Sequence, residues 1–76
     1  MPKLPILSGK RLFKLLLKHG FVFVRQSGSH LFIESEGGKL STVIPLHGNE
    51  DLGKGILKSI LNDLEITVER LVKMLN

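Results

Sequence analysis

Residues 21–45 read FVFVRQSGSHLFIESEGGKLSTVIP and carry most of the information about the fold. Three runs within this stretch are rich in aromatic and β-branched residues, which are typical of strands. The runs are separated by SGS at 27–29 and by Gly37 and Gly38, small residues that form tight turns between antiparallel strands. Pro45 ends the third run because it has no backbone N–H to donate. The stretch predicts a three-stranded antiparallel meander with strands over 21–26, 30–35 and 40–44.

Helical patterns flank this stretch on both sides. Ser8 is a favourable N-cap for a helix over 9–18, and Gly20 suits the left-handed residue that ends it. After the sheet, apolar residues recur with helical spacing over 54–64. Thr67 is placed to cap a last helix. We therefore expect an α+β fold of order α-β-β-β-α-α, with helices covering one face of the sheet and the other face left open.

Composition limits the class of protein. The chain has 76 residues and no cysteine, so we expect a single domain over 1–76 without disulfides, in the cytoplasm. Its longest apolar runs, 15–17 and 21–24, are far shorter than the roughly 20 residues that span a bilayer, so we expect no membrane insertion. Eleven Lys and Arg against seven Asp and Glu give a net charge of +4, which favours polyanions or an acidic protein as partners.

The second strand contains the strongest candidate for a functional group. Side chains alternate along a strand, so Leu31 and Ile33 lie on one face, and His30 and Phe32 on the other. If the aliphatic pair packs against the helices, His30 and Phe32 lie on the open face, with Arg25 on the neighbouring strand. The opposite orientation would bury His30.

These residue types suit cleavage of RNA without a metal. RNA supplies its own nucleophile, the 2′-hydroxyl, so the protein needs a proton-transfer group and cations for the phosphate. His30 can exchange protons near neutral pH, and Arg25 can contact phosphate. Lys54 and Lys58 lie one helical turn apart and can contact phosphate as well. The plain alternatives are a histidine that only bonds the turn backbone, and lysines that are merely solvated.

Gly28 and Ser29 precede His30, and small residues there let a charged ligand approach the backbone. His47 is a candidate second acid or base, although a histidine in a loop after a proline more often bonds backbone. His19 suits the end of the first helix. The three histidines lack metal-ligand spacing and the chain has no nucleotide-binding or serine-triad pattern, so we expect no metal and no cofactor.

Five segments resemble one known family when they are taken in order. The whole string is similar to the HicA family of toxin mRNA interferases, which belong to prokaryotic toxin–antitoxin pairs. Each segment is common alone, but their order and spacing together are specific. The segments are SGK at 8–10, HGF at 19–21, RQSGSH at 25–30, VIPLHGN at 43–49 and GILKSIL at 55–61.

The resemblance implies a double-stranded-RNA-binding-domain-like fold and a type II toxin that acts as an endoribonuclease on mRNA. It implies that the histidine of the Gly-Ser-His motif, His30 in this chain, is the catalytic residue. It also implies a HicB-type antitoxin that covers the active face.

Two other functions remain open from the sequence. The topology permits a non-catalytic module that binds double-stranded RNA, because such modules read shape and backbone. Alternatively, the cations serve only an acidic protein partner, and the isolated chain has no affinity for RNA.

Overall fold

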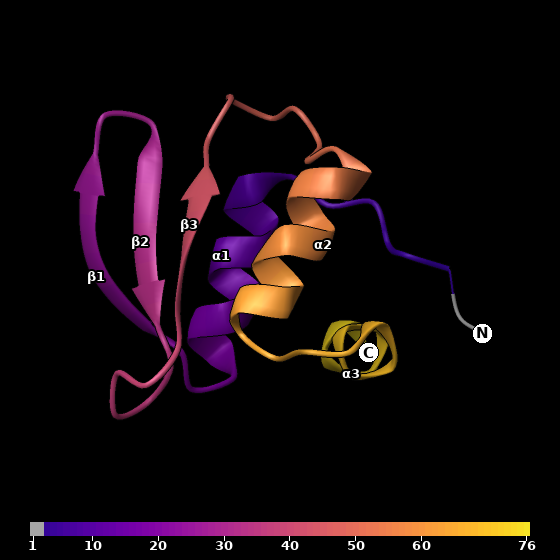
Figure 1. The fold of residues 1–76 in the computed structure, drawn as a ribbon. Coiled ribbons are helices and arrows are strands. Elements are labelled where there is room, and N and C mark those ends of the chain that lie inside the picture. The colour runs from indigo at the N-terminus through magenta and orange to yellow at the C-terminus, as the bar shows by residue number, and fades with distance from the viewer. Residues whose placement is uncertain (1–2) are drawn as a thin grey trace.

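The computed structural model describes residues 3–76, which contain three helices and one three-stranded sheet (Figure 1). This confirms the predicted α+β class with the α-β-β-β-α order of double-stranded-RNA-binding domains and an added C-terminal helix. Residues 1–2 of the predicted domain lie outside the described residues. The helices are α1 (Gly9–Lys18), α2 (Lys54–Asp63) and α3 (Val68–Leu75), and the strands are β1 (Val22–Ser27), β2 (His30–Glu34) and β3 (Ser41–Pro45).

Helix α1 begins and ends at the residues that the sequence indicated. The Ser8 hydroxyl accepts a hydrogen bond from a backbone N–H one turn into the helix, at 3.2 Å. Gly20 follows the helix with φ +94°, and the Phe21 N–H donates to the carbonyl oxygen of Leu16 at 3.0 Å. This is a Schellman motif, in which the second residue past the C-cap returns to the last turn. Because that N–H serves the helix end, β1 begins at Val22, one residue later than expected.

The sheet is the predicted meander, with strand order β1-β2-β3 and antiparallel pairing throughout. The turn between β2 and β3 passes through Gly37 and Gly38, which both have positive φ. It is closed by reciprocal backbone and side-chain hydrogen bonds between Ser35 and Leu40. Strand β2 begins at His30 as predicted, and the remaining strand limits differ from the predicted ones by one residue. Pro45, which was expected to follow the third strand, is instead its last residue and pairs with His30.

Helices α1 and α2 lie side by side on one face of the sheet, and α3 packs across their far end (Figure 1). The core lies between the sheet and these helices, and no helix of the described chain covers the opposite sheet face. All buried apolar side chains belong to one cluster, which consists of Leu7, Leu12, Leu16, Phe21, Leu31, Ile33, Ile44, Leu57, Ile60, Leu61, Leu64, Ile66, Leu71 and Met74.

The start of α1 is fixed against the end of β3 and the loop that follows it. Gly9 packs so closely on the carbonyl oxygen of Pro45 that a Cβ atom at position 9 would collide with it. The Leu52 N–H donates to the carbonyl oxygen of Leu7 at 2.7 Å, which ties the loop before α2 to the segment before α1. The first turns of both main helices are thus held near the β1–β2 turn end of the sheet.

Candidate functional site

A two-residue hairpin loop positions His30. Ser27 pairs with His30 across the loop, and Gly28 has φ +58° at its first position, as in type II′ turns. The Gln26 side chain donates from Nε2 to the carbonyl oxygen of Gly28 at 2.9 Å. On the other side of β2, the Leu46 N–H donates to the carbonyl oxygen of Ser29 at 2.6 Å. The segment Gly28-Ser29-His30 is therefore held on both sides although it is exposed.

Strand β2 is oriented so that His30 is accessible to solvent. Leu31 and Ile33 are only 3% and 1% exposed, whereas His30 is exposed. His30 lies opposite Ser27 on one neighbouring strand and opposite Pro45 on the other, at the end of the open face. A large ligand can therefore reach its imidazole from solvent.

An irregularity in β1 brings Arg25 to the same face. Phe23 pairs with Ile33 on the helix-covered side, but the next pair along is Arg25 with Phe32, so Val24 is an extra residue in β1. Such a β-bulge places two residues opposite one and shifts the alternation that follows. Regular alternation from Phe23 would send Arg25 toward the helices, and the bulge instead leaves it on the open face.

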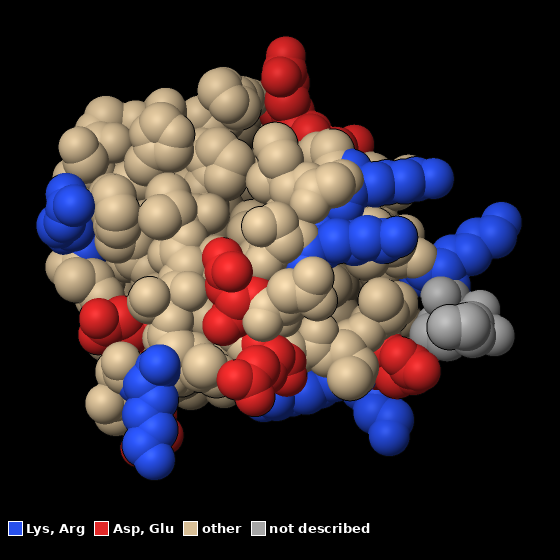
Figure 2. All heavy atoms as spheres, in the orientation of Figure 1, with Lys and Arg blue, Asp and Glu red and all other residues tan. Residues whose placement is uncertain are grey.

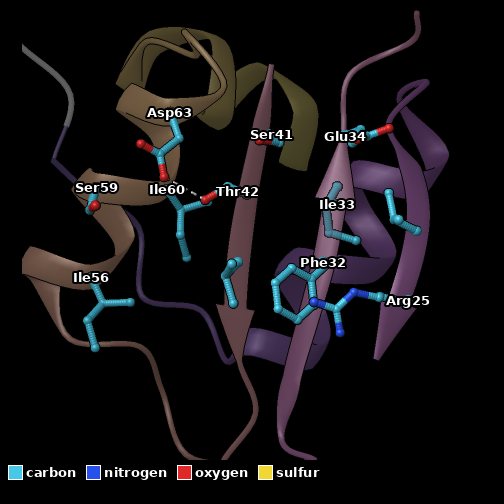
Figure 3. Close-up of a pocket in the computed structure, with 12 residues that line it drawn as sticks. Arg25, Phe32, Ile33, Glu34, Ser41, Thr42, Ile56, Ser59, Ile60 and Asp63 are labelled. Carbon is cyan, nitrogen blue, oxygen red and sulfur yellow. Dashed lines mark hydrogen bonds between the residues drawn. The ribbon is translucent and has the colours of Figure 1, made fainter. Parts of the chain in front are cut away.

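Arg25 lies over the aromatic ring of Phe32. Its Cζ atom is 3.8 Å from the ring centroid, which is a close cation–π contact, and Figure 3 shows the guanidinium overlapping the ring. Phe32 and His30 are two residues apart on the same face of β2. The bulge and the strand alternation thus place His30, Arg25 and Phe32 on the same face of the sheet, with Arg25 and Phe32 in contact.

A hollow of about 600 Å³ extends from Arg25 and Phe32 across the open face to α2, and His30 is not among the residues that line it. Figure 3 shows Arg25 and Phe32 on one side of it and Ile56 and Ser59 on the other. The Thr42 hydroxyl donates to an oxygen of the Asp63 carboxylate at 2.9 Å, which joins β3 to the end of α2. The full lining consists of Val24, Arg25, Phe32, Ile33, Glu34, Ser41, Thr42, Val43, Ile56, Ser59, Ile60 and Asp63.

The two candidate lysines lie elsewhere. At 100° per residue, Lys54 and Lys58 fall on the opposite side of α2 from Ile56 and Asp63, which line the hollow. Lys58 instead borders a separate hollow beside the connection from α2 to α3. Figure 2 shows positive charge on the β1 side and other cations projecting from the α2 side, with acidic side chains and uncharged surface between them. The predicted site residues therefore form two groups, one at the hairpin and one on α2.

His47 is exposed in the loop after β3, two residues beyond the partner of His30. His19 is exposed at the C-cap of α1. Residues 3–76 include no group of three or more His, Asp or Glu side chains arranged to hold a metal ion. None of the helices in that part of the chain has the length and apolar character that crossing a membrane requires.

Sequence reasoning missed the β-bulge and the contact that it creates. The run VFVRQS contains three apolar residues in succession, so period-2 alternation does not reveal which one is extra. The hydrogen bond from the Gln26 side chain to the turn was also missed, although a glutamine beside a Ser-Gly turn is a recognisable signal for it.

Comparisons with known proteins give one family. A family model described as the HicA toxin of bacterial toxin-antitoxin systems matches residues 9–66, from the start of α1 to just before α3. A search of curated proteins finds no match. The matched region covers more than half of the 76 residues and includes the hairpin, the open face and α2. The resemblance seen in the sequence is thereby confirmed, and the chain belongs to the HicA family of bacterial toxins.

Proposed function

We propose that this chain is the toxin of a type II toxin–antitoxin pair and acts as a metal-independent endoribonuclease on mRNA. Family membership supports the toxin role and an antitoxin partner. The observation that carries the enzymatic part is the exposed imidazole of His30, held by a hydrogen-bonded hairpin on the same sheet face as Arg25. We further propose that residues 1–76 act as a single domain in the cytoplasm.

His30 acts as the general base or acid of the cleavage step. As a base, it takes the proton from a ribose 2′-hydroxyl while that oxygen forms a bond to the adjacent phosphorus. The bond from phosphorus to the 5′-oxygen breaks, and the 5′-oxygen takes a proton from water or from His47. The Arg25 guanidinium offsets the charge that develops on the phosphate oxygens. One positioned proton-transfer group contributes about 10²- to 10⁴-fold in rate.

The remaining site residues bind the RNA backbone. A Cβ added to Gly28 would meet no atom within 4 Å, so a phosphate can approach this part of the turn closely, next to the exposed Ser29. Lys54 and Lys58 lie on the far side of α2 from the hollow, so they contact phosphates of the RNA that are farther from the cleaved bond. Neither a metal nor a cofactor takes part.

The antitoxin partner is a HicB-type protein that covers the open face. Apolar side chains on that face and on the adjoining side of α2 are exposed in the isolated chain, among them Val24 at 46%, Val43 at 38% and, on α2, Ile56 at 48%. An exposed apolar patch with a polar rim is typical of surfaces that bind another protein. Covering it would also close access to His30.

The test compares the wild-type chain with His30→Ala in an RNA degradation assay that contains EDTA. We expect the wild type to cleave mRNA and the variant to lose at least about 10²-fold in rate. His19→Ala is the matched control, because that histidine is also exposed but lies at the C-cap of α1. Expression of the wild type without an antitoxin should arrest growth, and expression of His30→Ala should not.

Undiminished cleavage by His30→Ala would remove this mechanism. A second candidate function, binding of double-stranded RNA without cleavage, is favoured by a hollow on the helix side of the hairpin that is lined by Lys10, Lys14 and Gln26. It predicts salt-dependent affinity for duplex RNA, no products in the assay and no effect of His30→Ala.

A further inference from the structure

Phe32 is an aromatic side chain on the open face, where an antiparallel sheet usually presents polar residues. It is half-buried at the centre of the face and pairs with Arg25 on β1 and Val43 on β3. The guanidinium of Arg25 lies over its ring, and both planar groups line the hollow beside α2 (Figure 3). The exposed guanidinium of Arg25 over the half-buried ring of Phe32 is hereafter called the platform.

The surroundings of this platform define the chemistry of a ligand. Val43 and Ile56 form apolar walls, and the carboxylates of Glu34 and Asp63 with the hydroxyl of Ser59 lie around the hollow. Its volume of about 600 Å³ lies within the ~300–1,000 Å³ of small-molecule sites. A flat ligand with apolar faces and polar edges, such as a nucleobase, fits this combination.

We propose that Phe32 with Arg25 stacked over it is the binding platform for one unpaired base of the RNA next to the cleaved bond. This inference rests on the proposed function and specifies the form of its substrate. Phe32 and His30 are separated by two residues on one strand, about 7 Å along its axis. A base on the platform therefore places a neighbouring sugar and phosphate beside the imidazole.

The platform selects single-stranded RNA. Bases in a duplex are covered on both faces by their neighbours, whereas unpaired bases stack on aromatic rings and on guanidinium planes. Stacking tolerates any base sequence, because every base has a π-face. Phe32 is thus a substrate-positioning residue, and it acts through stacking and not through an ionic contact.

The first experiment measures RNA affinity in a His30→Ala background, so that cleavage does not interfere. The probes are a single-stranded oligoribonucleotide without secondary structure and a duplex of the same sequence. We expect Phe32→Leu to weaken single-strand binding about tenfold, because the variant loses the ring that supports the Arg25 guanidinium under the base; the loss is within the range measured for base-stacking residues. The loss should persist at high salt, which weakens phosphate contacts but not stacking.

Phe23→Leu is the matched control. Phe23, on the neighbouring strand, is 43% exposed, but it lies on the helix-covered side. There its ring packs edge-to-face with that of Phe13, with 5.8 Å between the ring centroids. The same substitution at positions 23 and 32 therefore removes a phenyl ring from opposite faces of the sheet. We expect Phe23→Leu to leave RNA affinity within twofold.

The second experiment detects the stack directly. The chain has no tryptophan, so Phe32→Trp in the His30→Ala background introduces a single indole. We expect the single-stranded probe to quench its fluorescence, and an abasic oligomer of equal length to leave it unchanged. The indole introduced by Phe23→Trp should not respond to either probe.

The outcomes separate this inference from the function on which it rests. Quenching without cleavage by the wild-type chain would support the platform and contradict the nuclease. Cleavage together with unchanged affinity in Phe32→Leu and no quenching would overturn the platform and leave the nuclease standing. Loss of antitoxin binding alone in Phe32→Leu would overturn it as well, because the face would then serve a protein.

Discussion

Gly9 shows how one missing side chain determines where the first helix lies. The carbonyl oxygen of Pro45 occupies the space that a Cβ atom at position 9 would need, and Ile44 and Leu46 side chains close the rest. We expect Gly9→Ala to lower the free energy of unfolding by about 1–3 kcal/mol, the usual cost of overpacking. Urea denaturation of the purified variant measures this difference.

Gly55→Ala is the control for Gly9→Ala. Gly55 lies in the first turn of α2, and a Cβ atom there would meet nothing within 4 Å. Its replacement should raise the free energy of unfolding by about 0.4–1 kcal/mol, because alanine restricts the unfolded chain. Equal effects of the two substitutions would contradict the close approach at Gly9.

The ends of the helices were predictable because their signals are local. Ser8 and Thr67 both accept the backbone N–H three residues ahead, as their positions before apolar periodic runs indicated. The alternation of Leu31 and Ile33 with His30 was also readable, but the sequence left open which of the two faces of β2 packs against the helices. In contrast, the bulge at Val24 depends on how β1 pairs with β2, so no local pattern in β1 determines it.

Deletion of Val24 tests the description of β1. Phe23 lies opposite Ile33 and Arg25 opposite Phe32, which are consecutive residues of β2, so β1 without Val24 would pair with β2 in regular register. We therefore expect Arg25 to stay on the open face when Val24 is deleted. The affinity of the deletion variant for the single-stranded probe should be within about threefold of that of the chain with Val24. If β1 instead alternated regularly through Val24, the deletion would move Arg25 to the other face, and affinity would fall as in Arg25→Ala.

The distribution of charge over the molecule predicts two kinds of phosphate contact. Arg25 lies on the same sheet face as His30, whereas Lys54 and Lys58 lie on the side of α2 that faces away from the hollow. We expect Arg25→Gln to lower kcat and to reduce the salt slope of RNA affinity by about 0.7, the value for one phosphate contact on a single strand. The Lys54→Gln, Lys58→Gln double variant should weaken binding of long RNA only and leave kcat unchanged.

Lys39→Gln is the control for these charge changes. Lys39 is exposed in the turn between β2 and β3, at the end of the sheet away from His30. It should change neither kcat nor the salt slope. If this variant weakened binding as much as Arg25→Gln, net charge rather than the place of each cation would determine affinity. Net charge was readable from the sequence, but the separation of its cations was not, because it depends on how α2 packs.

The backbone hydrogen bond between Leu52 and Leu7 limits how far the chain can be shortened at its N-terminal side. A fragment cut at the limits of the family match, 9–66, would discard Leu7, Leu71 and Met74, which are 2%, 0% and 8% exposed. Each truncated core side chain of this kind costs about 2–5 kcal/mol, and a whole domain has only about 5–15 kcal/mol of stability. The smallest piece that folds must therefore start upstream of Leu7 and keep α3.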